Sequence, residues 1–90
     1  MTLQFDDRDP VWNGARMTVH FLAHSNSTRV VCAVSIEALQ DHFGVQGFDG
    51  DEAVPAAIAN KSTIESVAQQ LYGSRPLDPD GLLIIKTADF

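Results

Sequence analysis

The segment RMTVHFLAHSNSTRVVCAV, residues 16–34, decides the fold of this 90-residue chain. Its first half places apolar residues at positions 17, 19, 21 and 23, with mostly polar residues between them. The polar cluster Ser25-Asn26-Ser27 then separates this half from an apolar run at 30–34. Because side chains along a strand point alternately to opposite faces, the pattern predicts a β-hairpin. We expect its strands at about 15–23 and 28–34, with one face turned toward a core.

Two more strands are expected, one on each side of the hairpin in sequence. Residues 2–5 suit a short N-terminal strand. Residues 6–14 are rich in turn signals, with Trp12 placed to close one end of the core. Residues 82–87 suit a C-terminal strand whose first four residues are all apolar. Such a run is typical of a central strand that is buried on both faces.

Two helices are expected between the hairpin and the last strand. The first, at 36–43, has Ser35 in the N-cap position and Gly44 as its stop. The second is a long helix at 52–72, with apolar residues at helical spacing and Asp51 as its cap. Pro55 fits this helix only near its beginning. The fold class is therefore α+β, with an antiparallel or mixed sheet of about four strands whose order stays open.

The expected strands carry more apolar surface than two helices can cover. Residues 30–34 and 82–85 are apolar on both faces, whereas one layer of helices covers only one face of a sheet. The second face would need the other helix, the loop around Phe48, or another subunit. An apolar patch left open usually marks an interface, which makes self-association an accessible hypothesis.

Size and composition limit the classes of protein. Ninety residues make one domain, 1–90, with a modest core. The net charge is −6, and the six Lys and Arg residues are scattered, so the chain lacks the basic surface that nucleic-acid binding requires. The single cysteine, Cys32, excludes an intrachain disulfide. Without a signal-like start or an apolar run of about 18 residues, we expect a cytoplasmic protein with no membrane segment.

Residues able to carry chemistry are few and dispersed. His20 and His24 lie four residues apart on one strand, roughly 13 Å, so they cannot share a metal ion. Cys32 sits in an apolar strand, where a cysteine behaves as a small buried hydrophobe. We therefore predict no catalytic, cofactor-binding or metal-binding residues. His20, Cys32 and Tyr72 are kept as candidates to edge a pocket between the hairpin and the long helix.

Acidic and charged residues of the second half receive structural interpretations. The acidic cluster at 49–52 fails the calcium-loop pattern, because Val54 stands where the glycine is required and Asn60 where the glutamate is required. Helix capping explains the cluster better. Lys61 and Glu65 are expected to form a helical salt pair on an exposed face.

A series of landmarks along the chain resembles a known family. They are Phe5 and Trp12, the segments Phe21-Leu22-Ala23 and Val31-Cys32-Ala33-Val34-Ser35, Ala38-Leu39 with Asp41-His42-Phe43, then Ala53, Asn60, Ile64-Glu65 and Ala68, and last Gly81-Leu82-Leu83-Ile84 with Thr87-Ala88-Asp89-Phe90. This order resembles the small bacterial family named domain of unknown function 1488, over nearly the whole chain. The resemblance implies a single α+β domain of bacterial origin and no particular activity, substrate or cofactor. Pro55 departs from the family's usual helix.

Two functional hypotheses follow from these observations. The first is a non-enzymatic binding or regulatory module that associates with a protein partner or with itself, a homodimer being one form. The alternative is a small-molecule binder or enzyme whose pocket lies between the hairpin and the long helix. The missing catalytic set favours the first over an enzyme.

Overall fold

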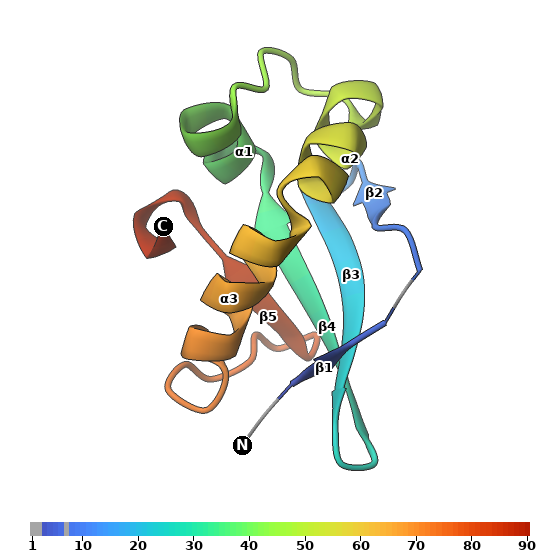
Figure 1. Cartoon of the computed structure of the whole chain (residues 1–90), viewed down its shortest axis with the longest axis vertical. Coiled ribbons are helices and arrows are strands. Elements are labelled where there is room, and N and C mark those ends of the chain that lie inside the picture. The colour runs from blue at the N-terminus through green and yellow to red at the C-terminus, as the bar shows by residue number, and fades with distance from the viewer. Residues whose placement is uncertain (1–2, 7) are drawn as a thin grey trace.

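The sheet has five strands in the computed structural model, which describes residues 3–6 and 8–90 (Figure 1). Within these residues three α-helices lie on one side of that sheet. The strands are β1 (Gln4–Phe5), β2 (Val11–Asn13), β3 (Thr18–Ser25), β4 (Thr28–Ser35) and β5 (Leu82–Ile85). The helices are α1 (Ile36–Phe43), α2 (Gly50–Ala59) and α3 (Lys61–Leu71), and a 3-10 turn, η1, spans Thr87–Asp89. The α+β class is thereby confirmed.

The predicted hairpin is confirmed as the antiparallel pair β3–β4. Its register runs from Thr18 opposite Ser35 to Ser25 opposite Thr28, which leaves a two-residue connection. The first strand begins three residues later than expected because residues 14–17 form a turn in which Met17 has a φ of 53°. Asn26 has a φ of 56° in the hairpin connection, a conformation that asparagine tolerates better than most residues.

Strand β2 corrects the expectation that residues 6–14 are only turn-rich. It pairs antiparallel with the first half of β3, with Val11 opposite His20 and Asn13 opposite Thr18. Strand β1 pairs with the second half of β3, so both short strands share one edge. The expected strand at 2–5 is thus found at Gln4–Phe5, while Thr2 lies outside the described residues.

The first expected helix is confirmed at its predicted bounds. The backbone N–H of Ala38 donates to Ser35 Oγ over 3.2 Å, and Gly44 ends α1 with a φ of 76°. Glycine adopts such a positive φ without the steric cost that a side chain adds.

The expectation of one long helix at 52–72 is wrong, because the helix is interrupted at Asn60 and forms two separate helices. Asn60 has a φ of −115°, and its side-chain amide donates to the Ala56 carbonyl, so a polar side chain competes locally with the helix. Helix α2 also begins earlier than expected, and its cap is Asp49, whose carboxylate accepts from the N–H of Glu52. Pro55 is consequently in the second turn. The expected Lys61–Glu65 pair is confirmed, with 3.8 Å between its charged atoms, but both residues are half-buried and not on an exposed face.

Strand β5 corrects two further expectations. It ends at Ile85 because residues 87–89 turn into η1, and it lies at the edge of the sheet, parallel to β4. Its outer carbonyls are nevertheless occupied. The Leu82 carbonyl accepts from the N–H of Asp78, and the Ile84 carbonyl accepts from the Arg75 guanidinium. The expected central position therefore belongs to β4.

The core lies between the sheet and the helices. Strands β3, β4 and β5 contribute alternate side chains that have almost no solvent exposure, and all three helices pack apolar residues against them. The largest of these buried side chains are Val19, Val30, Cys32, Val34, Leu39, Ile64, Leu83 and Ile85. The parity that the sequence assigned to the core, which includes Val19 and Phe21, is thus the one that faces the helices.

Candidate functional site

The face of the sheet opposite the helices is the most distinctive surface of the molecule, and we call it the open face. Within the described residues it carries the alternate side chains of the strands, and no helix covers it. Strand register arranges these side chains in rows across the sheet. Two adjacent apolar rows occupy its middle, the first being Val11, His20, Ala33 and Ile84, and the second Leu22, Val31 and Leu82.

Polar rows flank the two apolar rows at both ends of the strands. One consists of Asn13, Thr18 and Ser35, and strand alternation adds Lys86 to it. The other consists of Gln4, His24 and Arg29. An apolar middle with a polar border is the arrangement found at protein–protein interfaces.

The middle of the open face is only partly shielded from solvent. Val11 is 66% exposed, and Leu22, Val31 and Ile84 are half-buried. Ala33 has no exposed surface, since it lies between His20 and Ile84 on the neighbouring strands, and Leu82 is also buried. The open face is therefore a partly exposed apolar surface with a hollow of about 260 Å³ beside His20, and not a second core.

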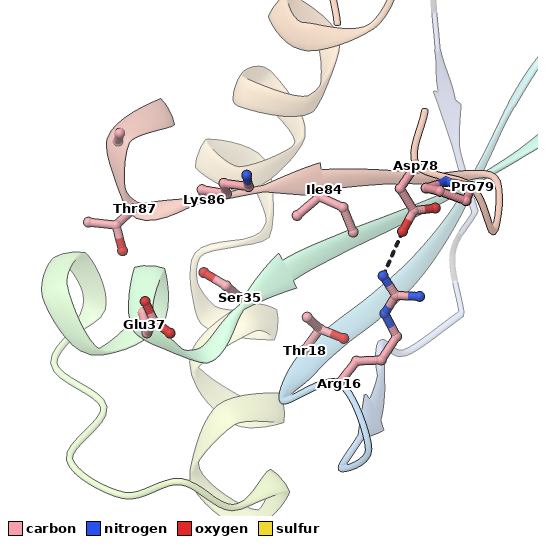
Figure 2. A pocket seen from close by; sticks show the side chains of 10 residues that line it. Arg16, Thr18, Ser35, Glu37, Asp78, Pro79, Ile84, Lys86 and Thr87 are labelled. Atoms are coloured by element: carbon pink, nitrogen blue, oxygen red, sulfur yellow. Dashed lines mark hydrogen bonds and ion pairs between the residues drawn. The ribbon is translucent and has the colours of Figure 1, made fainter. Parts of the chain in front are cut away.

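An ion pair shields part of this surface. Arg16, from the turn before β3, reaches Asp78 in the loop before β5 over 2.6 Å (Figure 2). It also contacts Asp80 in the same loop. Because β3 and β5 lie on either side of β4, the Arg16 side chain extends over the open face. The hydrogen bond from the backbone N–H of Leu82 is the main cause of the lowered pKa of Asp78, and Arg16 adds to it.

A hollow of about 580 Å³ opens beside this ion pair. Figure 2 shows Thr18, Ser35 and Ile84 along its floor, with Glu37 and Lys86 at its far side. Its charged side chains belong to both signs, and its floor is the end of the open face. We therefore treat this hollow as part of the open face.

His20 is the titratable side chain of the apolar rows. Its Nε2 lies 2.8 Å from Thr18 Oγ1, and its ring is half-buried. Burial lowers the pKa of His20, the positive charge of Arg16 lowers it further, and Asp78 acts in the opposite direction. The neutral imidazole is thus favoured more than in a fully solvated histidine.

The structure does not bring the three pocket candidates of the sequence together. His20 projects from the open face, whereas Cys32 is fully buried on the helix side, where desolvation raises the pKa of its thiol to about 12. Tyr72 follows α3 and is half-buried. A hollow between the hairpin and the helices holds only about 10 Å³ and is lined by Pro10, Phe21, Ala57, Lys61, Ile64 and Glu65. That volume is about one water-sized probe.

Within residues 3–6 and 8–90, no group of three or more His, Cys, Asp and Glu side chains is placed to hold a metal ion. None of the helices formed by these described residues combines the length and apolar character needed to cross a membrane.

These features define a class: a small α+β domain in which helices cover one face of a mixed sheet and leave the other open. The model of the family described as "Protein of unknown function (DUF1488)" matches residues 3–85. The chain belongs to this family. The resemblance seen in the sequence is thereby confirmed.

A solved structure supports the fold independently. It is the crystal structure of a protein of unknown function of the same family from Shewanella loihica PV-4, at 17% sequence identity and a TM-score of 0.81. The alignment covers 93% of this chain and 91% of that one. No curated protein matches the chain.

Proposed function

We propose that this protein is a non-enzymatic binding module that associates with a second copy of itself through the open face. The observation that carries the proposal is the pair of adjacent apolar rows, which no helix of the described residues covers and which polar rows border. Burying apolar surface of this kind is the main favourable term in protein association. The cytoplasmic location predicted from the sequence is part of this proposal.

The state of the sheet edges favours association through the face. At the β5 edge, the carbonyls of Leu82 and Ile84 already accept hydrogen bonds from Asp78 and Arg75. At the opposite edge, β1 and β2 are only two and three residues long. Short or occupied edges offer little backbone for a partner strand, so strand addition is disfavoured.

The distribution of charge favours a second copy as the partner. The described residues on or beside the open face include four basic and five acidic side chains: Arg8, Arg16, Arg29 and Lys86 with Asp6, Asp9, Glu37, Asp78 and Asp80. The rest of the sequence therefore carries −5 of the net charge of −6. Two copies repel each other through most of their surfaces, and this repulsion is weakest at the open face.

The size of the open face sets the expected affinity. Four strands at about 4.8 Å spacing and four rows about 6.8 Å apart give about 500 Å² per copy. About 1,000 Å² in total is at the low end for specific interfaces, so we expect a reversible dimer with a dissociation constant on the order of 10–100 µM.

Sedimentation equilibrium at pH 7.5, from 5 µM to 1 mM protein, tests the proposal. The mass should rise from that of one chain toward that of two. Val11→Glu places a charge on the most exposed apolar residue of the open face and should leave the protein monomeric at about 100 µM. Ile58→Glu is the matched control, because Ile58 is also an exposed apolar residue but lies on α2.

Two results would reject self-association through the open face. One is a monomer over the whole concentration range. The other is a dimer that Ile58→Glu dissociates and Val11→Glu leaves intact, since that would place the interface on the helix side. Circular dichroism of both variants verifies that they are folded.

A further inference from the structure

His20 occupies an exceptional position on the open face. It stands in the middle of an apolar row, between Val11 of β2 and Ala33 of β4, with Leu22 two residues further along β3. The two apolar rows hold seven described residues, and the other six are aliphatic. The other histidine of this face, His24, belongs to the polar row and is exposed.

The charged groups around His20 come from three segments. Arg16 belongs to the turn before β3, Asp78 to the loop before β5, and Arg8 with Asp9 to the segment before β2, where they line a hollow together with His20. The facing residues of β2 and β4 are Val11 and Ala33, which carry no charge.

Within the described residues, neither acid of these groups forms a hydrogen bond or an ion pair with His20. Asp9 is exposed to solvent. The Asp78 carboxylate already accepts from Arg16 and from the backbone N–H groups of Asp80 and Leu82. Thr18 Oγ1 is hydrogen-bonded to Nε2 of the His20 ring. The protonated ring carries a charge and two N–H donors that each need an acceptor, whereas the neutral ring has only one N–H donor.

We infer that protonation of His20 opposes the self-association of the open face, so that the dimer forms near neutral pH and dissociates in mild acid. This inference rests on the proposed dimer. A second copy removes water from the apolar rows, and the protonated ring then becomes a buried cation close to Arg16, without a hydrogen-bond acceptor for its second N–H.

The direction of the pH dependence follows from linkage. Burial already lowers the pKa of His20 in the single chain, with the charge of Arg16 as the next cause and Asp78 opposing both. Association extends the burial and lowers the pKa of His20 again, so forming the dimer releases protons. The dimer is therefore tightest above the pKa that His20 has in the monomer, and its affinity falls as the pH decreases through that pKa.

The dissociation constant at pH 7.5 and at pH 5.5, measured by sedimentation equilibrium, tests this inference. Because each dimer contains two copies of His20, we expect association to be at least about tenfold weaker at pH 5.5. His20→Gln keeps a polar side chain without a titrating ring and should bind equally at both pH values. His24→Gln is the matched control and should keep the pH dependence of the unaltered protein.

The outcomes distinguish the role of His20 from the proposed self-association on which it rests. A monomer at pH 7.5 rejects both. A dimer that is equally tight at pH 5.5, or an unchanged pH dependence in His20→Gln, rejects the role of His20 and leaves the dimer standing. His20→Asn provides a second neutral variant should His20→Gln not fold, and circular dichroism at both pH values shows that dissociation is not unfolding.

Discussion

Replacing Gly50 by alanine sets two physical effects against each other. Gly50 is the first residue of α2, and alanine is the better helix former by up to about 1 kcal/mol. In the structure, however, a Cβ at this position would lie 2.5 Å from Trp12 Cγ and 2.7 Å from Trp12 Cβ. Real Cβ atoms do not approach so closely, so the helix and β2 would have to separate.

The expected result is a loss of stability. Overpacking of this kind costs about 1–3 kcal/mol, which exceeds the gain in helix propensity. We expect a net loss of about 1–2 kcal/mol in the free energy of unfolding, and for a domain of this size a melting temperature lower by roughly 4–16 °C. Far-UV circular dichroism is the suitable probe, because Trp12 is the single tryptophan and is itself varied.

A double-mutant cycle shows whether contact with Trp12 is the cause. In a Trp12→Gly background the Trp12 Cβ and ring atoms that a Cβ at position 50 would meet are all removed, so Gly50→Ala should be neutral or stabilising there. Should Gly50→Ala stabilise the protein with Trp12 present, or destabilise it equally in both backgrounds, the close packing of Trp12 on α2 would be refuted.

Two other predictions concern single side chains. Arg75→Leu removes the donors to the Ile84 carbonyl and to the carboxylate of Asp89, whose side chain is 9% exposed. Chemical denaturation should therefore show a free energy of unfolding that is lower by about 2–3 kcal/mol. Arg8→Gln is the control at a 79% exposed site and should change this free energy by less than about 0.5 kcal/mol. Cys32, with a thiol whose pKa burial raises to about 12, should not react with a thiol reagent at pH 8 until guanidinium unfolds the protein, and rapid reaction of the folded protein would contradict its burial.

The elements that could be predicted from the sequence are those with a signal at both ends. Helix α1 has Ser35 before it and Gly44 after it, and its bounds were predicted correctly. The hairpin combines alternation with a polar connection. Strand β2 has no such signals, since three residues are too few to show alternation and Asn13-Gly14 is typical of a turn. The break at Asn60 was missed because apolar spacing continues through it into α3.

The open face could be predicted only in part. Alternation in the hairpin separates the parity of Val19 from that of His20, and the surplus of apolar positions indicated that one face lacks a cover. Which segments meet on that face depends on contacts far apart in the sequence. Arg16 and Asp78 are 62 residues apart, and no local pattern connects them. The rows around His20 likewise require the register of three strand pairs.

The parallel pairing of β4 with β5 also has a consequence for biosynthesis. The hairpin can close as soon as residue 35 has left the ribosome. Strand β4 must then wait for its parallel partner β5, residues 82–85, which follows three helices in the sequence. Until then Leu83 and Ile85 are absent from the core. The nascent chain exposes the unpaired backbone edge of β4 and the apolar side chains with which the helices pack against β5. The newly made polypeptide is thus expected to be more prone to aggregation before β5 has been translated than after it.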